Sequence, residues 1–320
     1  MIVVWRITQH CNLRCPFCEW DQSLPRSRQH ADAREVLRFA TLLAEWQAAT
    51  GRRVLVSWLG GEPLLWPELA GVAAEVHALG LAQSATTNGT TLGQAKAQDL
   101  VLRLFAELTV SVDGFADFHD PMRGWAGGFD KLRDAVKALA TRRQSRAALR
   151  LRANVVLMRQ NLHAFPSLCE ALSDWGIDEI TFNALGGRDR PEFYPTHALQ
   201  PGDVAWLRAE LPALRARLAA CDARITGESG YLDRFAATAR GQPIAVADCG
   251  PGREFLFIDE HGVVAPCDFT VAGYGVPTTA ITTVDDLLAL PARFAARQRE
   301  KRADACDDCR STRVFAKFSA

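Results

Sequence analysis

The sequence predicts an α/β protein built on a parallel sheet, and two observations carry that prediction. Short apolar segments alternate with amphipathic helical segments over the first 185 residues, and the alternation then stops. Strand-helix alternation at this spacing implies right-handed crossovers and a parallel sheet. Six such units suit an incomplete barrel as well as an open sheet, so the pattern alone leaves these two architectures open.

The individual elements follow from periodicity and from the residues between them. The first helix carries apolar residues at helical spacing over 31–50, and the first strand holds Val3, Val4 and Ile7. The further strands are predicted at 54–59, 82–87, 108–112, 149–157 and 179–185. The further helices are predicted at 67–79, 92–105, 129–140 and 162–175.

The chain after residue 185 follows a different pattern. An irregular stretch opens at 186, and a helix is predicted near 204–218. Beyond it, 254–258 and 263–265 read as a β-hairpin with Gly262 in the turn. We therefore expect three parts: an α/β core over 1–185, a helical linker that could cover a substrate over 186–241, and a small domain over 242–320.

Composition excludes several partners. Lys+Arg 37 against Asp+Glu 37 leaves no net charge, so nonspecific nucleic-acid binding has no global electrostatic source. No apolar run reaches the roughly 18 residues that span a bilayer, and the first residues read as a strand rather than as a leader. We expect a cytoplasmic protein with no nucleic-acid or membrane partner.

Nine cysteines need an explanation other than disulfides in a reducing cytosol. Three of them fall within eight residues near the N-terminus, and four lie in the last 72 residues. Cys169 and Cys221 stand alone, and we expect both to be small buried hydrophobic residues.

The first three cysteines have the form C-x3-C-x2-C, at Cys11, Cys15 and Cys18. Three thiolates can hold three irons of a 4Fe-4S cluster and leave the fourth iron open to an external chelator. A zinc site with His10 as a further ligand is the alternative. These cysteines alone do not decide between iron and zinc.

Three further motifs follow in order, each at the carboxyl end of a predicted strand, where parallel α/β folds bind ligands. They are Gly60-Gly61-Glu62-Pro63, Thr86-Thr87-Asn88-Gly89 and Ser111-Val112-Asp113-Gly114. Any one of them could simply be a turn into a helix. The ordered set is much harder to reach by chance, so it favours a ligand site.

With these motifs the chain resembles the radical S-adenosylmethionine (SAM) superfamily over essentially its whole length. The resemblance implies a partial (β/α)6 barrel, in which Cys11, Cys15 and Cys18 ligate a 4Fe-4S cluster whose open iron chelates SAM. Reductive cleavage of SAM would then give a 5′-deoxyadenosyl radical that abstracts a hydrogen atom from the substrate. A small reductant protein such as flavodoxin or ferredoxin would supply the electron.

The same resemblance implies SAM contacts. Gly60, Gly61 and Glu62 would receive the methionine amino group, and Phe17 would pack near the adenine. Ser111 and Arg123 would contact the ribose and the carboxylate, because the paired donors of arginine suit a carboxylate. Asn88 and Leu185 complete the predicted set. The alternative for Arg123 is a surface ion pair.

The C-terminal cysteines resemble the Twitch extension, which holds one auxiliary 4Fe-4S cluster. Its ligands would be Cys249, Cys267, Cys306 and Cys309, and no cysteine follows Cys309 as a full SPASM extension would require. A four-cysteine zinc ribbon is the alternative. Asp268 follows Cys267 as in sulfatase-maturing relatives, where the aspartate takes a proton from the substrate. A structural turn cap is the alternative role for Asp268.

Two substrate classes remain open. The first is a small molecule, such as a sugar or aminocyclitol-like intermediate, and the second is a ribosomally made peptide that is crosslinked or epimerised. Only ten residues precede Cys11, too few for the leader-binding domain that many peptide maturases carry, and this favours the small molecule. A zinc-stabilised binding module is a third, non-enzymatic reading. Polar residues beyond the core could line a pocket: Arg188, Arg190, Tyr194, His197, Glu228 and Tyr231.

Overall fold

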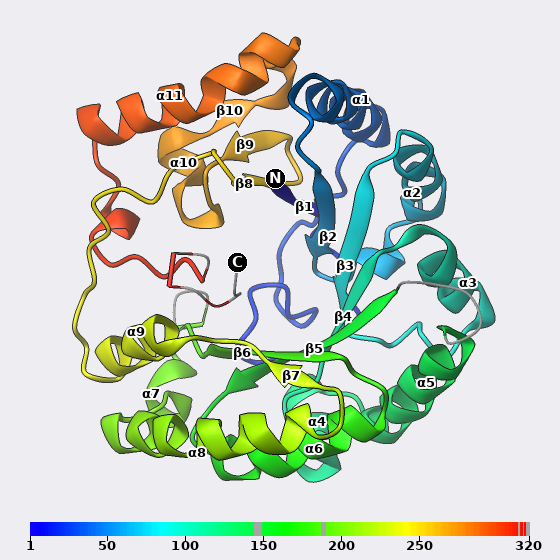
Figure 1. Ribbon diagram of the computed structural model, residues 1–320, viewed down its shortest axis with the longest axis vertical. Helices are drawn as coiled ribbons and strands as arrows, with labels where there is room; N and C mark the ends of the chain where they lie inside the picture. The colour runs from blue at the N-terminus through cyan, green and yellow to red at the C-terminus, as the bar shows by residue number, and fades with distance from the viewer. Residues whose placement is uncertain (144–148, 187–189, 313, 316, 318–320) are drawn as a thin grey trace.

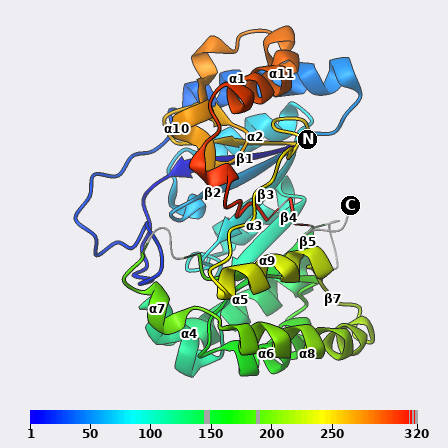
Figure 2. The same cartoon turned by 90° about the vertical axis from the view of Figure 1, so that its left-hand side faces the viewer.

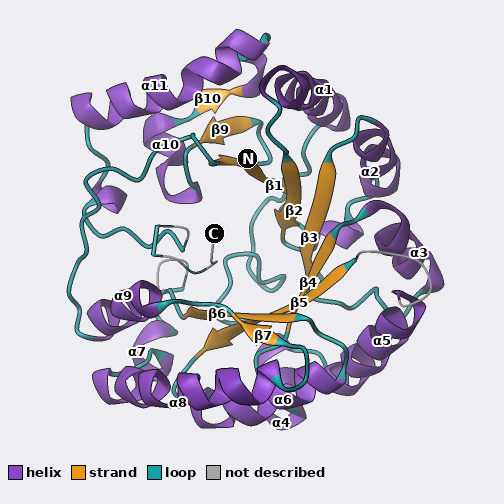
Figure 3. Ribbon diagram, viewed as in Figure 1, coloured by secondary structure: helices purple, strands orange, loops and turns teal. Residues whose placement is uncertain are grey.

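The computed structural model describes residues 1–143, 149–186, 190–312, 314–315 and 317 (Figure 1). Its strands form one sheet in the order β10-β9-β8-β1-β2-β3-β4-β5-β6-β7. The sheet curves around the centre of the molecule, and helices line its outside (Figure 3). The predicted α/β partial barrel is confirmed.

Six parallel strands make up the barrel, and each strand is separated from the next in the chain by at least one helix. The strands are β1 (Ile2–Thr8), β2 (Leu55–Gly60), β3 (Ala82–Thr87), β4 (Glu107–Ser111), β5 (Arg150–Leu157) and β6 (Glu179–Ala184). The helices are α1 (Ala33–Thr50), α2 (Leu69–Ala78), α3 (Ala95–Leu104), α4 (Ala116–Arg123), α5 (Gly128–Arg143) and α6 (Phe165–Asp174).

Helix α4 is an α-helix of the barrel that periodicity did not predict. It is short, it contains Pro121, and it ends where Gly124 takes a left-handed conformation with φ of 62°. Proline and glycine so close together read as a loop, and a helix of eight residues gives little periodic signal. Its position matters because its last residue is Arg123.

The outer face of the sheet holds the hydrophobic core. On β1 the side chains of Val3, Trp5 and Ile7 are buried against the helices, and the Trp5 ring meets Phe39 of α1 edge-on at 5.8 Å between centroids. Helix α1 begins at Asp32, whose carboxylate accepts hydrogen bonds from the first-turn amides, and it ends at Gly51 with φ of 68°. Packing against α1, whose two ends are fixed in this way, sets the direction in which β1 leaves the core.

The inner face of the sheet is polar where β5 and β6 lie side by side. Asn154 of β5 accepts hydrogen bonds from Thr181 and Asn183 of β6, both at 2.9 Å. Leu151, Ala153 and Val155 alternate with Asn154 and belong to the core. A few convergent polar groups of this kind can fix the orientation of a ligand.

The region after β6 continues the same sheet. The strand β8 (Phe255–Ile258) pairs in parallel with β1, on the side opposite β2, and β7 (Arg224–Ile225) pairs with β6. The predicted hairpin forms between β8 and β9 (Val263–Ala265), with Gly262 at φ of 75° in the turn. The boundaries expected at 186 and 242 are therefore not breaks in the sheet.

The other elements of this region surround the strands. They are α7 (Tyr194–His197), α8 (Pro201–Ala219), α9 (Ser229–Ala239), α10 (Val271–Tyr274), β10 (Val276–Pro277) and α11 (Val284–Glu300). Figure 2 shows α11 beside α1. Among the described residues, no helix has both the length and the apolar character needed to cross a membrane.

We expect the packing of α1 against β1 to contribute strongly to the free energy of unfolding. We expect Phe39→Ala to lower the free energy of unfolding by about 3–5 kcal/mol, because it removes a fully buried ring and leaves a cavity. Leu288→Ala in α11 is the matched control, since Leu288 is 50% exposed, and its cost should stay within about 0.5 kcal/mol. Urea unfolding followed by circular dichroism measures both. Equal effects of the two substitutions would contradict this packing.

Candidate functional site

The loop that follows β1 holds Cys11, Cys15 and Cys18, and backbone hydrogen bonds fold it into a compact turn. The Cys18 amide donates to the Cys15 carbonyl at 3.0 Å, and the Arg14 amide donates to the Arg123 carbonyl at 3.2 Å. Burial raises the pKa of Cys15 to about 11 and that of Cys18 to about 12. Thiols in such surroundings lose their protons when a metal cation replaces them, which fits a metal or cluster site.

The glycine pair after β2 lets this loop lie directly on the sheet edge. The Gly61 amide donates to the Thr8 carbonyl and the Glu62 amide to the His10 carbonyl, both at 2.8 Å. A Cβ atom on Gly61 would lie 2.3 Å from the His10 carbonyl oxygen, so no larger residue fits. The glycine pair therefore places the backbone of the motif Gly60-Gly61-Glu62-Pro63 against the cysteine loop.

Glu62 links the ends of β2 and β3 from a fully buried position. Its Oε1 accepts hydrogen bonds from the Thr87 hydroxyl at 2.7 Å and the Leu64 amide at 3.0 Å, and its Oε2 accepts one from the Asn88 amide at 2.6 Å. Burial raises the pKa of Glu62 to about 7. The structure thus gives Glu62 a loop-fixing role, and contact with the methionine amino group stays a prediction.

Asn88, in the motif Thr86-Thr87-Asn88-Gly89, also contacts the cysteine loop. Its side-chain amide donates to Asn12 Oδ1 at 3.0 Å and lies 3.7 Å from Cys11 Sγ. This pairing between positions 76 residues apart was not visible in the sequence. Asn88 therefore orients Cys11. A contact between Asn88 and SAM stays a prediction.

Arg123 forms a buried ion pair with Asp113. Arg123 Nε and a terminal nitrogen reach Asp113 Oδ2 at 2.8 and 2.6 Å, and the two side chains are 9% and 0% exposed. The alternative of a surface ion pair is therefore wrong. Asp113 Oδ1 accepts from the Val156 amide at 2.9 Å, and the guanidinium lies 5.6 Å from the centre of the Phe17 ring. The pair connects α4, β4 and the cysteine loop.

Three other predicted residues lie at or near the same edge of the sheet. Ser111 ends β4, and Leu185 directly follows β6, with its amide donating to the Leu157 carbonyl at 3.3 Å. The Phe17 ring lies 6.2 Å from Phe193, and the exposed His10 ring stacks on His30 at 4.4 Å. The roles predicted for Ser111, Leu185 and Phe17 toward SAM stay predictions.

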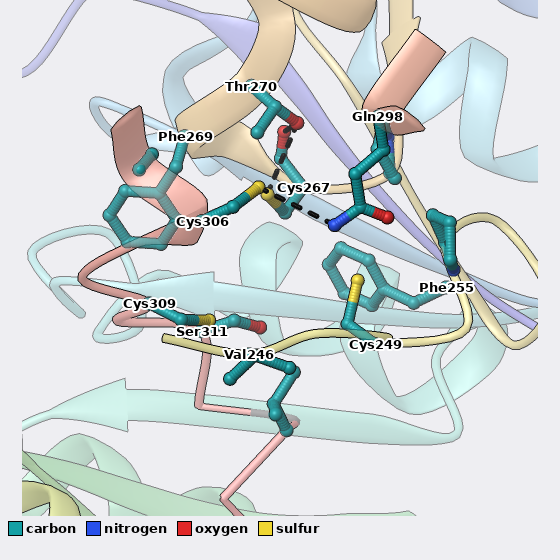
Figure 4. A pocket seen from close by; sticks show the side chains of 14 residues that line it. Val246, Cys249, Phe255, Cys267, Phe269, Thr270, Gln298, Cys306, Cys309 and Ser311 are labelled. Carbon is teal, nitrogen blue, oxygen red and sulfur yellow. Dashed lines mark hydrogen bonds between the residues drawn. The ribbon is translucent and has the colours of Figure 1, made fainter. Parts of the chain in front are cut away.

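The structure brings the four C-terminal cysteines together around one pocket, shown in Figure 4. Backbone hydrogen bonds join their segments: the Cys309 amide donates to the Ile244 carbonyl at 2.8 Å, and the Val246 amide donates to the Cys306 carbonyl at 3.2 Å. Burial raises the pKa of Cys249, Cys267 and Cys309, and that of Cys267 reaches about 11.

The rest of this pocket is largely apolar and includes Phe255 at the start of β8. Two further polar groups approach the sulfurs: Gln298 Nε2 donates toward Cys306 Sγ at 3.8 Å, and the Thr270 hydroxyl, which donates to the Cys267 carbonyl, lies 3.3 Å from Cys267 Sγ. In the described part of the chain no three Cys, His, Asp or Glu side chains form a ready group for one metal ion.

Asp268 does not share this pocket. Its neighbours Cys267, Phe269 and Thr270 line the pocket, while the Asp268 side chain is exposed. The role as a base calls for burial that raises its pKa, whereas Asp268 is exposed in this structure. The role of Asp268 as a base stays a prediction.

The remaining predicted residues divide between buried and exposed positions. Cys169 is buried as expected, but Cys221 is exposed in the turn after α8, so the prediction for Cys221 was wrong. Tyr231 is buried and bonds the Phe182 carbonyl at 2.8 Å, and Arg190 pairs with Asp21 of the cysteine loop at 3.0 Å. Arg188 lies outside the described residues.

A curved parallel sheet with a three-cysteine loop and a glycine pair at its carboxyl edge is typical of iron-sulfur enzymes that cleave SAM. The model of the Radical SAM superfamily matches residues 5–172, more than half of the chain. The protein therefore belongs to the radical SAM superfamily, whose cofactors are a 4Fe-4S cluster and SAM.

Comparison with known proteins gives more distant relatives of several activities. Pre-heme d1 synthase of Dinoroseobacter shibae is 28% identical over 60% of this chain and 46% of its own length. PqqA peptide cyclase of Rhodopseudomonas palustris is 26% identical over 87% of this chain and 70% of its own. The structure of Streptococcus suis SuiB bound to precursor peptide SuiA has a TM-score of 0.70 at 15% identity, over 99% of this chain and 70% of that one.

The chain spans less than half the length of the first of these relatives. The family model establishes the family, and the solved structure shows the same fold. The substrate is a separate question.

The glycine pair provides a test of how the first site is built. Gly61→Ala should lower the iron bound after anaerobic reconstitution and cost about 1–3 kcal/mol of stability, because its Cβ displaces the His10 carbonyl beside Cys11. Gly71→Ala in α2 is the control, since nothing lies within 4 Å of its Cβ and alanine favours a helix. Iron analysis and thermal unfolding check both. Normal iron content in Gly61→Ala would show that the close approach is dispensable.

Proposed function

We propose that this enzyme uses two iron-sulfur sites to modify a ribosomally made peptide by crosslinking or epimerisation. Cys11, Cys15 and Cys18 ligate the SAM-binding cluster. Cys249, Cys267, Cys306 and Cys309 ligate one auxiliary cluster, as in a Twitch extension. The observation that carries the proposal is the gathering of four cysteines, from segments up to 60 residues apart, around one pocket.

The first site fits its cofactors in donor chemistry and in shape. When bound, the cluster and SAM supply a radical that abstracts hydrogen. The three cysteines are buried or half-buried in one short loop, and glycine backbone lies against that loop where a side chain would clash. Asn88 orients Cys11, and the Asp113–Arg123 pair holds the loop from the other side through the Arg123 carbonyl.

The second site suits a cluster in its lining. The four thiols surround a largely apolar pocket. The Gln298 amide donates toward Cys306 Sγ, and hydrogen bonds to sulfur stabilise its negative charge and tune a cluster's potential.

A peptide substrate is favoured by relatives that match this chain over most of its length. The match to PqqA peptide cyclase covers 87% of this chain, and the structure of SuiB bound to precursor peptide SuiA matches over 99% of it. An AdoMet-dependent heme synthase of Methanosarcina barkeri also matches over 84%, so a small molecule is the competing substrate. We therefore prefer the peptide to the small molecule, and we make the small molecule an outcome of the test.

Removing the Cys306/Cys309 pair should affect the auxiliary-cluster site and leave the SAM-binding site intact. We expect the double variant Cys306→Ala/Cys309→Ala to lose about half of its iron, because two remaining thiolates hold a cluster poorly, and to keep SAM cleavage to 5′-deoxyadenosine. Peptide modification should stop. The exposed Cys221→Ala is the control and should retain all three properties. Full iron content with normal product in the double variant would remove the auxiliary cluster from the proposal.

The substrate class can be tested by co-expression with the short open reading frames that neighbour the gene. A crosslinked peptide should lose two hydrogens, and an epimerised peptide should take up solvent deuterium at the altered carbon, both seen by mass spectrometry. Cys15→Ala is the negative control because it should lack the SAM-binding cluster. If only a sugar or a tetrapyrrole is consumed and every peptide stays unchanged, the small-molecule reading replaces the peptide.

A further inference from the structure

Two polar side chains from separate helices reach the sulfur of Cys306 in the second cysteine pocket. Gln298 Nε2 of α11 donates toward Cys306 Sγ at 3.8 Å, and the Tyr274 hydroxyl at the end of α10 lies 3.9 Å from the same atom. Figure 4 shows the Gln298 amide directed at this sulfur. Tyr274 and Gln298 are 32 and 8 residues away from Cys306 in the sequence, so the fold brings them together.

A second contact fixes the direction of the hydrogen bond between Tyr274 and Cys306. The Ala303 amide donates to the Tyr274 hydroxyl oxygen at 2.7 Å. The hydroxyl has one proton of its own, and this proton is left to donate elsewhere. A cysteine that ligates iron is a thiolate and has no proton to give. With a cluster bound, Tyr274 is therefore the donor and Cys306 the acceptor.

Both donors and their acceptor are held in place by other contacts. Tyr274 is only 3% exposed, and its carbonyl accepts a hydrogen bond at 2.9 Å from Arg297, the residue before Gln298. This bond ties the end of α10 to α11. Arg302 donates to the Cys306 carbonyl at 2.8 Å. The side chains of Tyr274 and Gln298 therefore approach the sulfur from a fixed framework.

The donors at two of the other sulfurs are of a different kind. Backbone amides donate to the sulfurs of Cys267 and Cys309, and the Thr270 hydroxyl beside Cys267 donates to the Cys267 carbonyl. A backbone amide stays in place whatever side chain its residue carries. At Cys306 the two donors are side-chain groups, so a substitution can remove each of them separately.

We propose that Tyr274 and Gln298 raise the reduction potential of the auxiliary cluster by donating two hydrogen bonds to Cys306. A reduced cluster carries one more negative charge than the oxidised cluster, and hydrogen bonds to its sulfurs stabilise that charge. The largely apolar lining strengthens these bonds because little water competes with them. A cluster of higher potential accepts an electron more readily. This inference rests on the proposed function for the cluster itself.

The test compares the reduction potential of the auxiliary cluster in single variants of the full-length enzyme with both clusters reconstituted. Tyr274→Phe removes the hydroxyl and keeps the ring, and Gln298→Leu removes the amide at nearly the same size. Tyr231→Phe is the matched control, because its hydroxyl is also buried but donates to the Phe182 carbonyl at 2.8 Å, outside this pocket. Anaerobic redox titration followed by electron paramagnetic resonance measures the potential.

We expect Tyr274→Phe and Gln298→Leu each to lower the ratio of reduced to oxidised auxiliary cluster about threefold at a fixed applied potential. Each variant loses one hydrogen bond to an anionic sulfur. A threefold change corresponds to about 28 mV for a one-electron couple. Tyr231→Phe should leave the ratio unchanged. An unchanged potential in either pocket variant, or an equal shift in Tyr231→Phe, overturns the proposal.

Two further readings keep this test decisive. Iron analysis shows whether each variant holds its clusters, and Gln298→Leu leaves the contact between Ala303 and Tyr274 in place if Tyr274→Phe loads poorly. Addition of SAM identifies the resonance signal of the first cluster, because SAM binds the open iron there. A wild-type enzyme without a second signal would reject the auxiliary cluster and with it the proposed function. A second signal of the same potential in all variants rejects the tuning role alone.

Discussion

The structure depends on β1 being paired in parallel on both sides, with β2 and with β8. This strand ends directly in the first cysteine loop, and its other neighbour, β8, begins beside the second cysteine pocket through Phe255. The hairpin turn after β8 returns to the carboxyl end of β1, where Glu260 accepts hydrogen bonds from Arg6 and Gln9. One strand therefore fixes the position of both cysteine sites.

Buried polar groups then hold the loops at the barrel edge. Glu62 and the Asp113–Arg123 pair are enclosed by protein, and a buried charge is tolerated only where partners replace its water. Each group has such partners on two or more elements: Glu62 bonds the start of the loop after β3, and Asp113 bonds β5. Loss of either partner would leave an uncompensated group, so these loops have one favourable arrangement.

The sequence predicted those features that depend on local pattern. Periodicity placed six strands and five helices, and motif order placed the first site at the carboxyl edge. It could not place features set by tertiary contact: the partner of Arg123, the exposure of Cys221 and Asp268, or the helix around Pro121.

The parallel pairing of β8 with β1 also bears on how the chain can be divided. In a protein cut after residue 241, β1 would become an edge strand with unpaired amide and carbonyl groups, and the apolar Val3, Trp5 and Ile7 beside it would lose part of their cover. Open edges of this kind associate with other chains and aggregate. The barrel is therefore not a separable module, and insoluble truncations would reflect an exposed sheet edge rather than a missing cofactor.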